Sequence, residues 1–312
     1  MRGPRFDRAV APGGYLWWYL DALSDDGSCG LTIIAFVGSV FSPYYARARA
    51  RSRWGKADPL AHCAINVALY RPGADVWVLS EYGAREVARG RDSFAVGSSC
   101  VSWEGDRLVI RFDERTAVLR QRVAGEVRLY PSAFPGQAFT IDARGRHTWW
   151  PVAPHAHVEA ELSEPSLRFR GAGYHDANFG EEPLEAAFSD WCWSRAALPD
   201  RTAVLYDTRR SDGSELRLGR VFRADGGVEP LAAPRVVDLG RTRWWIPRTI
   251  RTGGADARVV RTLEDTPFYA RSEVATEIDG QAALAVHESL SLARFASPVV
   301  QTMLPFRIRK VG

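Results

Sequence analysis

The sequence has few cysteines and no dense cysteine framework. Its 312 residues include only 4 cysteines, none of them in a C-x-x-C pair. Such spacing predicts neither disulfides nor a thiolate metal site, and it favours a reducing compartment. Residues 1–14 contain no apolar segment of the kind found in a secretory signal. We therefore expect the protein to stay inside the cell.

A strong charge imbalance is also absent. Lysine and arginine total 41 against 37 acidic residues, which leaves a formal net charge of +4 spread along the chain. Nucleic-acid binders usually carry a concentrated basic patch, so we expect no nucleic-acid partner. A composition that is 46% hydrophobic and 25% charged is typical of a soluble globular protein.

Several familiar cofactor and catalytic motifs are missing. The chain contains no G-x-S-x-G elbow, no phosphate-binding P-loop and no H-E-x-x-H helix. Residues 171–176 begin like a dinucleotide-binding loop but place Asp176 where the third glycine belongs. His155 and His157 could form half of a cupin-like metal site or a pair of structural histidines. We expect the second, since the rest of a cupin pattern is lacking, and hence neither metal nor cofactor.

Helical periodicity is weak, and no segment is convincing as a membrane span. Residues 27–46 lack charge, but they contain three serines, three glycines and a proline, so we expect a buried strand and a loop. Elsewhere apolar residues alternate with polar ones, as in 106–112, and turns rich in Gly, Asp and Ser separate these stretches. The pattern predicts a mainly β, antiparallel protein.

Aromatic residues are abundant and suggest a duplication. The chain has 11 Trp, 14 Phe and 10 Tyr. An aromatic strand at 15–21 has a counterpart at 188–194, and each precedes a series of candidate hairpins. We therefore expect two β-barrel domains, residues 1–165 and 166–312.

One basic segment has two interpretations. Between Tyr44 and Trp54, arginines recur at every second position. The segment is either a solvated loop or fraying helix, or a basic lip, flanked by aromatic residues, that rests on anionic lipid. The sequence leaves both open.

Two short strings combine polar and aromatic side chains. Residues i and i+2 of a strand share a face, so His147 points with Trp149, and Tyr174 points with Asp176. A carboxyl group beside rings and away from water is pushed toward its neutral form, which makes it a proton donor. Aromatic faces can hold a transient cation, with an attraction of about 1–2 kcal/mol per ring. The combination predicts carbocation chemistry, and a structural hydrogen-bond network is the alternative.

Four stretches, 14–21, 30–45, 62–70 and 173–180, resemble the acyclic carotenoid 1,2-hydratases of purple phototrophic bacteria, also called hydroxyneurosporene synthases. The resemblance runs nearly end to end. It implies two lipocalin-like antiparallel β-barrel domains packed together. It also implies a cofactor-independent lyase that adds water to the terminal C1=C2 double bond of acyclic carotenoids such as neurosporene and lycopene.

The family's catalytic pattern is His-x-Trp followed by Tyr-x-Asp, and it falls on His147, Trp149, Tyr174 and Asp176. The resemblance implies that Asp176 protonates C2 and that the rings of Trp149 and Tyr174 surround the cation at C1. His147 would either orient the acid or take the proton lost by the added water.

An insoluble polyene substrate has to be taken from a membrane, so we expect peripheral contact with lipid and no spanning helix. Two rival functions share the expected fold. One is a non-enzymatic lipocalin-like carrier of an apolar ligand, and the other is a different carbocation enzyme, such as a terpene hydratase or cyclase. Substrate preference and oligomeric state are left open.

Overall fold

The computed structural model describes residues 3–233 and 235–311, and most of them lie in β-strands. This confirms the mainly β prediction. The chain divides into two compact units. The first contains the described residues of 1–140, 146–183 and 302–312, and the second contains those of 141–145 and 184–301.

A single 13-stranded sheet forms the first unit. Its strands, in the order in which they are hydrogen-bonded, are β22 (Ile308–Val311), β4 (Val76–Tyr82), β3 (Cys63–Tyr70), β2 (Gly30–Val37), β1 (Tyr15–Ser24), β12 (Ser166–Gly180), β11 (His147–Glu164), β9 (Arg122–Pro131), β8 (Arg107–Arg115), β7 (Ser99–Glu104), β6 (Ser93–Val96) and β5 (Val87–Arg89), with β10 (Phe139–Thr140) on β11. All neighbours are antiparallel except β22 and β4.

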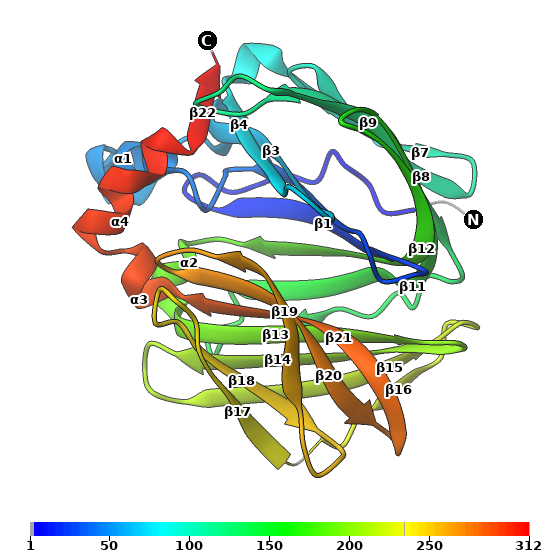
Figure 1. The fold of residues 1–312 in the computed structure, drawn as a ribbon. Helices are drawn as coiled ribbons and strands as arrows, with labels where there is room; N and C mark the ends of the chain where they lie inside the picture. Colours follow the sequence, from blue (N-terminus) through cyan, green and yellow to red (C-terminus); the bar gives the residue numbers. More distant parts are fainter. Residues whose placement is uncertain (1–2, 234, 312) are drawn as a thin grey trace. The chain divides into compact units, whose positions relative to one another are not determined.

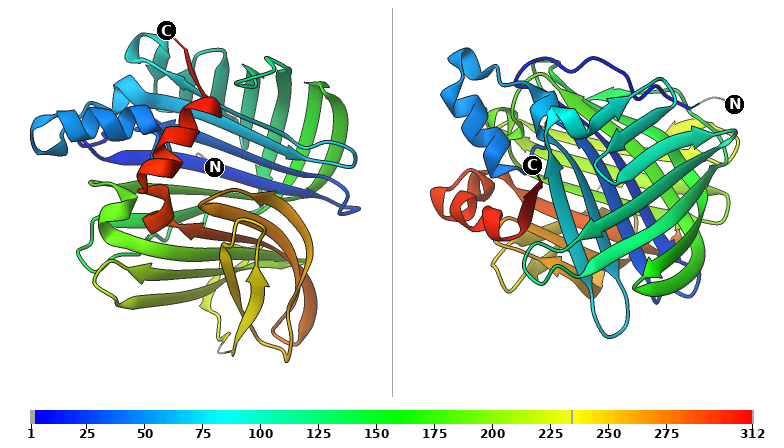
Figure 2. Two further views of the ribbon diagram at one scale, coloured as in Figure 1. Left: turned by 60° about the vertical axis from the view of Figure 1, so that its left-hand side comes forward. Right: turned by 90° about the horizontal axis from the view of Figure 1, so that it is seen from above.

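This sheet is strongly curled, as Figure 1 and the view from above in Figure 2 show. The hydroxyl of Tyr82 on β4 donates a 2.8 Å hydrogen bond to Glu114 on β8, although these strands are far apart in the sheet order. The concave face holds the apolar core, with Trp18, Ile33 and Val67 among its members. Because side chains alternate along a strand, the neighbours of Trp18 on β1 point to the opposite face.

Short helices accompany the strands of the first unit: α1 (Pro43–Arg51), η1 (Arg53–Gly55), η2 (Pro59–His62), η3 (Ala84–Glu86) and η4 (Leu304–Phe306). The sequence explains where α1 begins. The Ser42 side chain accepts hydrogen bonds from two backbone N–H groups of the first turn, and Pro43 occupies a position where a missing N–H costs nothing. Across the described ranges, no helix is both long and apolar enough to cross a bilayer.

The second unit has a seven-stranded antiparallel sheet and a two-stranded sheet. The first runs β16 (Val228–Pro230), β15 (Glu215–Arg223), β14 (Arg201–Arg210), β13 (Phe188–Leu198), β21 (Gln281–Ser291), β20 (Tyr269–Ile278) and β19 (Arg258–Asp265), and the second pairs β17 (Arg235–Arg241) with β18 (Pro247–Thr252). The remaining helices are α2 (Leu184–Ala187), α3 (Leu292–Phe295) and α4 (Pro298–Met303).

The two larger sheets share a strand order. Strands β1 to β4 are consecutive neighbours in the first sheet, as β13 to β16 are in the second. The later strands of each sheet, apart from β22, pair on the other side of β1 or β13. The expected boundary at residue 165 falls in the turn between β11 and β12, which pair with each other within the first unit.

Candidate active site

The sequence-predicted residues lie on the face of the first sheet that is opposite its apolar core. On β1, Tyr19 is aligned with Asp176 of β12, and Asp176 is aligned in turn with Pro151 of β11. One step along the sheet, Asn178 is aligned with Trp149. The long β11–β12 hairpin therefore places the acid and the indole on adjacent strands, beside the aromatic strand β1.

Asp176 is the centre of a buried cluster. Its Oδ2 accepts hydrogen bonds from Nε1 of Trp149 at 2.8 Å and from the hydroxyl of Tyr174 at 2.7 Å. Its Oδ1 lies 3.3 Å from Nδ2 of Asn178. Trp149 and Tyr174 are fully buried, and Asp176 is 3% exposed. The structure thus brings together three of the four residues that the sequence singled out.

The phenol of Tyr174 acts as a donor in this cluster. Burial, followed by the neighbouring carboxyl of Asp176, raises the pKa of Tyr174 well above its ordinary value. The phenol therefore keeps its proton, and its hydroxyl can donate to Oδ2. The indole of Trp149 also approaches the Tyr174 hydroxyl, at 3.2 Å, so the three polar groups form one connected network.

His147 occupies a separate position on the same strand as Trp149. It is aligned with Gly180, which lies four residues beyond Asp176 on β12. At about 3.3 Å per residue, the backbone of His147 is therefore about 13 Å along the sheet from that of Asp176. Its Nδ1 is 2.8 Å from the hydroxyl of Tyr15, and its Nε2 is 3.6 Å from Oε1 of Glu182. The imidazole therefore has its own supporting groups at some distance from the acid.

Gly180 leaves the space that the His147 ring needs. A Cβ atom at this position would lie 2.7 Å from Nδ1 of His147 and 2.7 Å from the ring of Tyr15. Both contacts are shorter than carbon atoms tolerate in packed interiors. The hydrogen bond between these two rings thus depends on glycine in the neighbouring strand.

Further aromatic rings line this face of the sheet. Phe139 is stacked on Trp149 with a centroid distance of 5.3 Å, and Trp17 is stacked on Tyr15 at 4.9 Å. The edge of Tyr19 meets Tyr174 at 6.1 Å. Such rings exclude water and present negative faces to a cation.

Sequence reasoning assigned no role to four groups that surround these residues. Tyr15 and Glu182 contact His147, Asn178 contacts Asp176, and Phe139 stacks on Trp149. Two weak signals were available. The aromatic alternation of β1 indicated a face lined by rings, and Asn178 continues the i+2 pattern of Tyr174 and Asp176 on β12.

His175, between Tyr174 and Asp176 on β12, is not part of the cluster. His175 points away from the site, and its Nδ1 is 2.8 Å from the carbonyl oxygen of Tyr19. Burial lowers the pKa of His175 to about 4, so the ring is neutral and donates to that carbonyl. Over the described part of the chain, no three His, Cys, Asp or Glu side chains are grouped to hold a metal ion.

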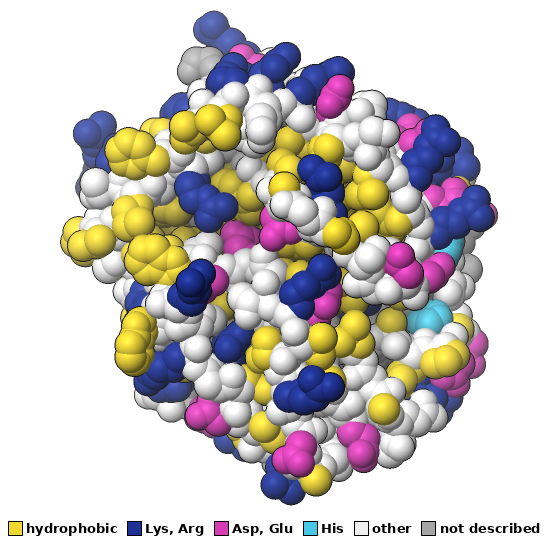
Figure 3. Space-filling view, viewed as in Figure 1, with side chains coloured by type: hydrophobic (Ala, Val, Ile, Leu, Met, Phe, Trp, Pro, Cys, Tyr) yellow, Lys and Arg dark blue, Asp and Glu magenta, His cyan; other side chains and the backbone are white. Residues whose placement is uncertain are grey.

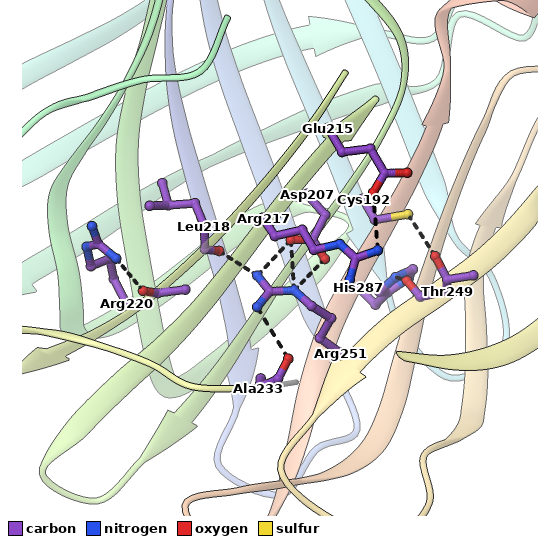
Figure 4. A network of polar contacts seen from close by, with 11 residues as sticks. Cys192, Asp207, Glu215, Arg217, Leu218, Arg220, Ala233, Thr249, Arg251 and His287 are labelled. Carbon is purple, nitrogen blue, oxygen red and sulfur yellow. Dashed lines mark hydrogen bonds and ion pairs between the residues drawn. The ribbon is translucent and has the colours of Figure 1, made fainter. Parts of the chain in front are cut away.

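The second unit contains a polar network of its own (Figure 4). The guanidinium of Arg251 binds the carboxylate of Asp207 at 2.8 and 2.9 Å and donates to the carbonyl oxygens of Leu218 and Ala233. The Arg251 guanidinium thus has a carboxylate and two carbonyl oxygens as acceptors. Paired and hydrogen-bonded in this way, a buried charge is a structural feature.

Comparisons with known proteins give a consistent picture. Residues 33–311 match the family model described as Carotenoid hydratase CrtC. The chain is 53% identical over 313 residues to the acyclic carotenoid 1,2-hydratase of Thiocapsa roseopersicina, with 100% of this chain and 76% of that protein covered. It is 46% identical over 307 residues to the enzyme of the same name from Rubrivivax gelatinosus, covering 98% of this chain and 75% of the relative.

Solved structures with low sequence identity share the fold. A Nitrosomonas europaea protein with the provisional name AttH has a TM-score of 0.61 at 17% identity, covering 89% of this chain and 92% of that one. Kievitone hydratase from Nectria haematococca has a TM-score of 0.56 at 10% identity, covering 93% and 98%.

Proposed function

Because this chain belongs to the carotenoid hydratase CrtC family, we propose that it is an acyclic carotenoid 1,2-hydratase. This cofactor-independent hydro-lyase adds water to the terminal C1=C2 double bond of neurosporene, lycopene or a related polyene. One observation carries the assignment of the acid: the carboxyl of Asp176 is buried among aromatic rings and receives two hydrogen bonds on a single oxygen.

The proton comes from Oδ1 of Asp176. Oδ2 is the acceptor for Trp149 and Tyr174, so the acidic proton is carried by the other oxygen, next to Asn178. Nδ2 of Asn178 donates to this oxygen, and a protonated Oδ1 can accept that hydrogen bond while it carries the acidic proton.

Two opposing effects act on the ionisation of the Asp176 carboxyl. Burial disfavours the carboxylate, and the proposed role requires the resting group to be protonated. Once the proton has left, the indole N–H of Trp149 and the hydroxyl of Tyr174 stabilise the carboxylate that remains. By stabilising the carboxylate, the two donors make the Asp176 carboxyl a stronger acid, whereas burial opposes its ionisation.

Protonation at C2 leaves a tertiary cation at C1, which is more stable than a secondary cation at C2. The rings of Trp149 and Tyr174 surround this cation, and the exclusion of bulk water prolongs its lifetime. Phe139 supports the cage by stacking on the indole of Trp149.

Water then adds to C1, and its lone pair forms the C–O bond. The proton that the bound water loses reaches Nε2 of His147 through intervening water, because the His147 backbone lies about 13 Å along the sheet from that of Asp176. A neutral His147 ring with its proton on Nδ1 donates to the oxygen of Tyr15. Glu182, 3.6 Å from Nε2, stabilises the resulting imidazolium. Release of this proton to solvent and reprotonation of Asp176 complete a cycle in which H has been added to C2 and OH to C1.

The substrate also implies a location. An acyclic carotenoid is dissolved in lipid, so the enzyme works inside the cell, in peripheral contact with the cytoplasmic or photosynthetic membrane.

Incubation with lycopene in water labelled with oxygen-18, followed by mass analysis, tests the proposal. We expect one labelled tertiary hydroxyl at C1 for each hydrated end. Retained but unchanged lycopene after prolonged incubation would identify a carrier instead. A cyclised or rearranged product would identify a different carbocation enzyme.

A further inference from the structure

The first unit displays a surface that the proposed chemistry does not use. We call it the basic rim: the exposed side chains of Arg47 and Arg51 on α1, of the segment 53–56 that follows it, and of Met303 and Phe306 near the C-terminus. Figure 3 shows apolar and basic side chains side by side over α1 and the C-terminal segment, both of which are labelled in Figure 1.

The two segments that carry the basic rim have a larger excess of basic residues than the rest of the chain. Residues 43–60 contain five basic side chains and one acid, Asp58, whereas 302–311 contain three basic side chains and no acid. Within the described ranges, Arg47, Arg51, Arg53 and Lys56 form no salt bridge. Their charges are therefore available to an anionic partner.

Apolar side chains lie exposed among these charges. Trp54 is 81% exposed and Phe306 is 72% exposed. Trp54 also has a left-handed backbone, with φ of 62°, a conformation that is rare and strained for a bulky residue. The chain thus holds an indole in solvent at an energetic cost.

The helix is anchored so that Arg47 and Arg51 face outward. Tyr45 and Arg49, four residues apart, are buried on one side of α1, and the Tyr45 hydroxyl donates a 2.7 Å hydrogen bond to the carbonyl oxygen of Gly14. Arg47 and Arg51, also four residues apart, project from another side and are exposed. The basic face is fixed in place by this packing.

The C-terminal segment lies beside α1. The ammonium of Lys310 on β22 is 4.9 Å from the ring centroid of Tyr44, and both views in Figure 2 place the two segments next to each other. Residues from opposite ends of the sequence therefore contribute to one surface.

We infer that the basic rim binds the surface of a bilayer containing anionic phospholipid. Arginine and lysine side chains would contact the phosphate groups, while Trp54 and Phe306 would enter the boundary between headgroups and acyl chains. The choice of a bilayer as the partner rests on the proposed function, which requires a substrate dissolved in lipid.

The basic rim is connected to the candidate active site through the residues just before β1. The N–H of Gly13 donates to the carbonyl oxygen of Ala57, and the carbonyl of Gly14 accepts from Tyr45. The next residue, Tyr15, is hydrogen-bonded to His147. Docking at this rim would bring the membrane to the end of β1 where the His147 group lies.

Flotation of the full chain with vesicles tests the inference. The vesicles contain phosphatidylcholine alone or phosphatidylcholine with phosphatidylglycerol, each at low and high NaCl. We expect binding to the anionic vesicles that is weakened by salt. The double variant R51E/R53E should lose about tenfold or more of this binding, and W54S should weaken it at both salt concentrations. The charge control is R168E/R170E on β12, which changes the net charge equally at the other end of β1. Because Arg168 and Arg170 are paired with Glu161 and Glu159, urea unfolding checks that this variant is folded, and it should bind like the wild type.

Equal losses in the control, or binding that does not depend on phosphatidylglycerol, would overturn the assignment. A dimer that W54S dissociates in sedimentation, without vesicle binding, would make the rim an interface between copies. Hydration of detergent-dispersed lycopene separates the two proposals. Hydration activity without vesicle binding would contradict only the inference about the basic rim. Vesicle binding without any hydration would contradict only the proposed function.

Discussion

The hydroxyl of Tyr174 donates a 2.7 Å hydrogen bond to Oδ2 of Asp176, two residues further along the same strand. Alternation in β12 places both side chains on one face, and the antiparallel partner β11 brings the indole N–H of Trp149 to the same oxygen at 2.8 Å. In the proposed mechanism, this carboxyl loses its proton from Oδ1 while the two donors stay on Oδ2.

Removing the phenol hydroxyl should slow the reaction without removing the acid. In Tyr174→Phe the carboxylate left after proton transfer loses one hydrogen bond, a contribution of about 1.5–3 kcal/mol for a charged acceptor. We expect kcat for lycopene hydration to fall roughly 10- to 100-fold, with KM little changed. Steady-state kinetics check this, and an unchanged kcat would show that the hydroxyl does not support the acid.

The indole of Trp149 can be tested as a donor separately from its ring. Trp149→Phe keeps an aromatic face but lacks the Nε1–H that binds Asp176. We expect a loss in kcat of similar size, and a smaller combined effect with Tyr174→Phe than the product of the two, because both donors act on one oxygen. Trp149→Ala is less informative, since it leaves a cavity that destabilises the fold by about 3–5 kcal/mol.

Adding one methyl group at Gly180 should separate His147 from Tyr15. The new Cβ would lie 2.7 Å from Nδ1 of His147, so the ring must move. We expect Gly180→Ala to lower the hydration rate about tenfold or more and to destabilise the fold by about 1–3 kcal/mol. Tyr15→Phe, which removes the hydroxyl alone, should lower the rate with little loss of stability. Activity retained in both variants would contradict the assigned role of His147.

Stability should decrease in acid because two buried histidines resist protonation. Burial lowers the pKa of His175 and of His287 from 6.5 to about 4. The unfolded chain takes up these protons near pH 6.5 and the folded chain only near pH 4. The stabilising contribution is therefore complete above pH 6.5 and is lost between about 6.5 and 4, on the order of 3 kcal/mol per histidine.

Urea unfolding across this pH range measures the effect. The variant His287→Gln keeps a donor for the carbonyl of Thr249, which His287 contacts at 2.8 Å, but it has no titrating ring. We expect the slope of unfolding free energy against pH to be smaller in this variant. An identical slope would show that His287 titrates alike in both states.

Local sequence pattern was sufficient for the fold class and for the acid cluster. Period-two alternation indicated antiparallel strands, and the i+2 relationship correctly placed Tyr174 with Asp176. The contacts of His147 could not be obtained in this way. They depend on the alignment of β1 with β12 and of β12 with β11, which joins Tyr15 to residues more than a hundred positions away.

The basic segment after β2 shows a different limit. The sequence left a solvated loop, a fraying helix and a basic lip open for this segment, and residues 43–51 form a helix. The capping residue Ser42 followed by Pro43 was the better signal, because it supplies acceptors for the first turn and needs no N–H at its start. Which arginines are exposed then depends on the packing of Tyr45, a tertiary contact.

The most direct test of the central claim is the hydration of lycopene by Asp176→Asn. The amide has nearly the same shape as the carboxyl and can still accept from Trp149 and Tyr174, but it cannot supply a proton to carbon. We expect a folded protein that retains lycopene and forms no labelled 1-hydroxy product in water enriched in oxygen-18. Conversion at a rate near that of the wild type would contradict the assignment of Asp176 as the acid.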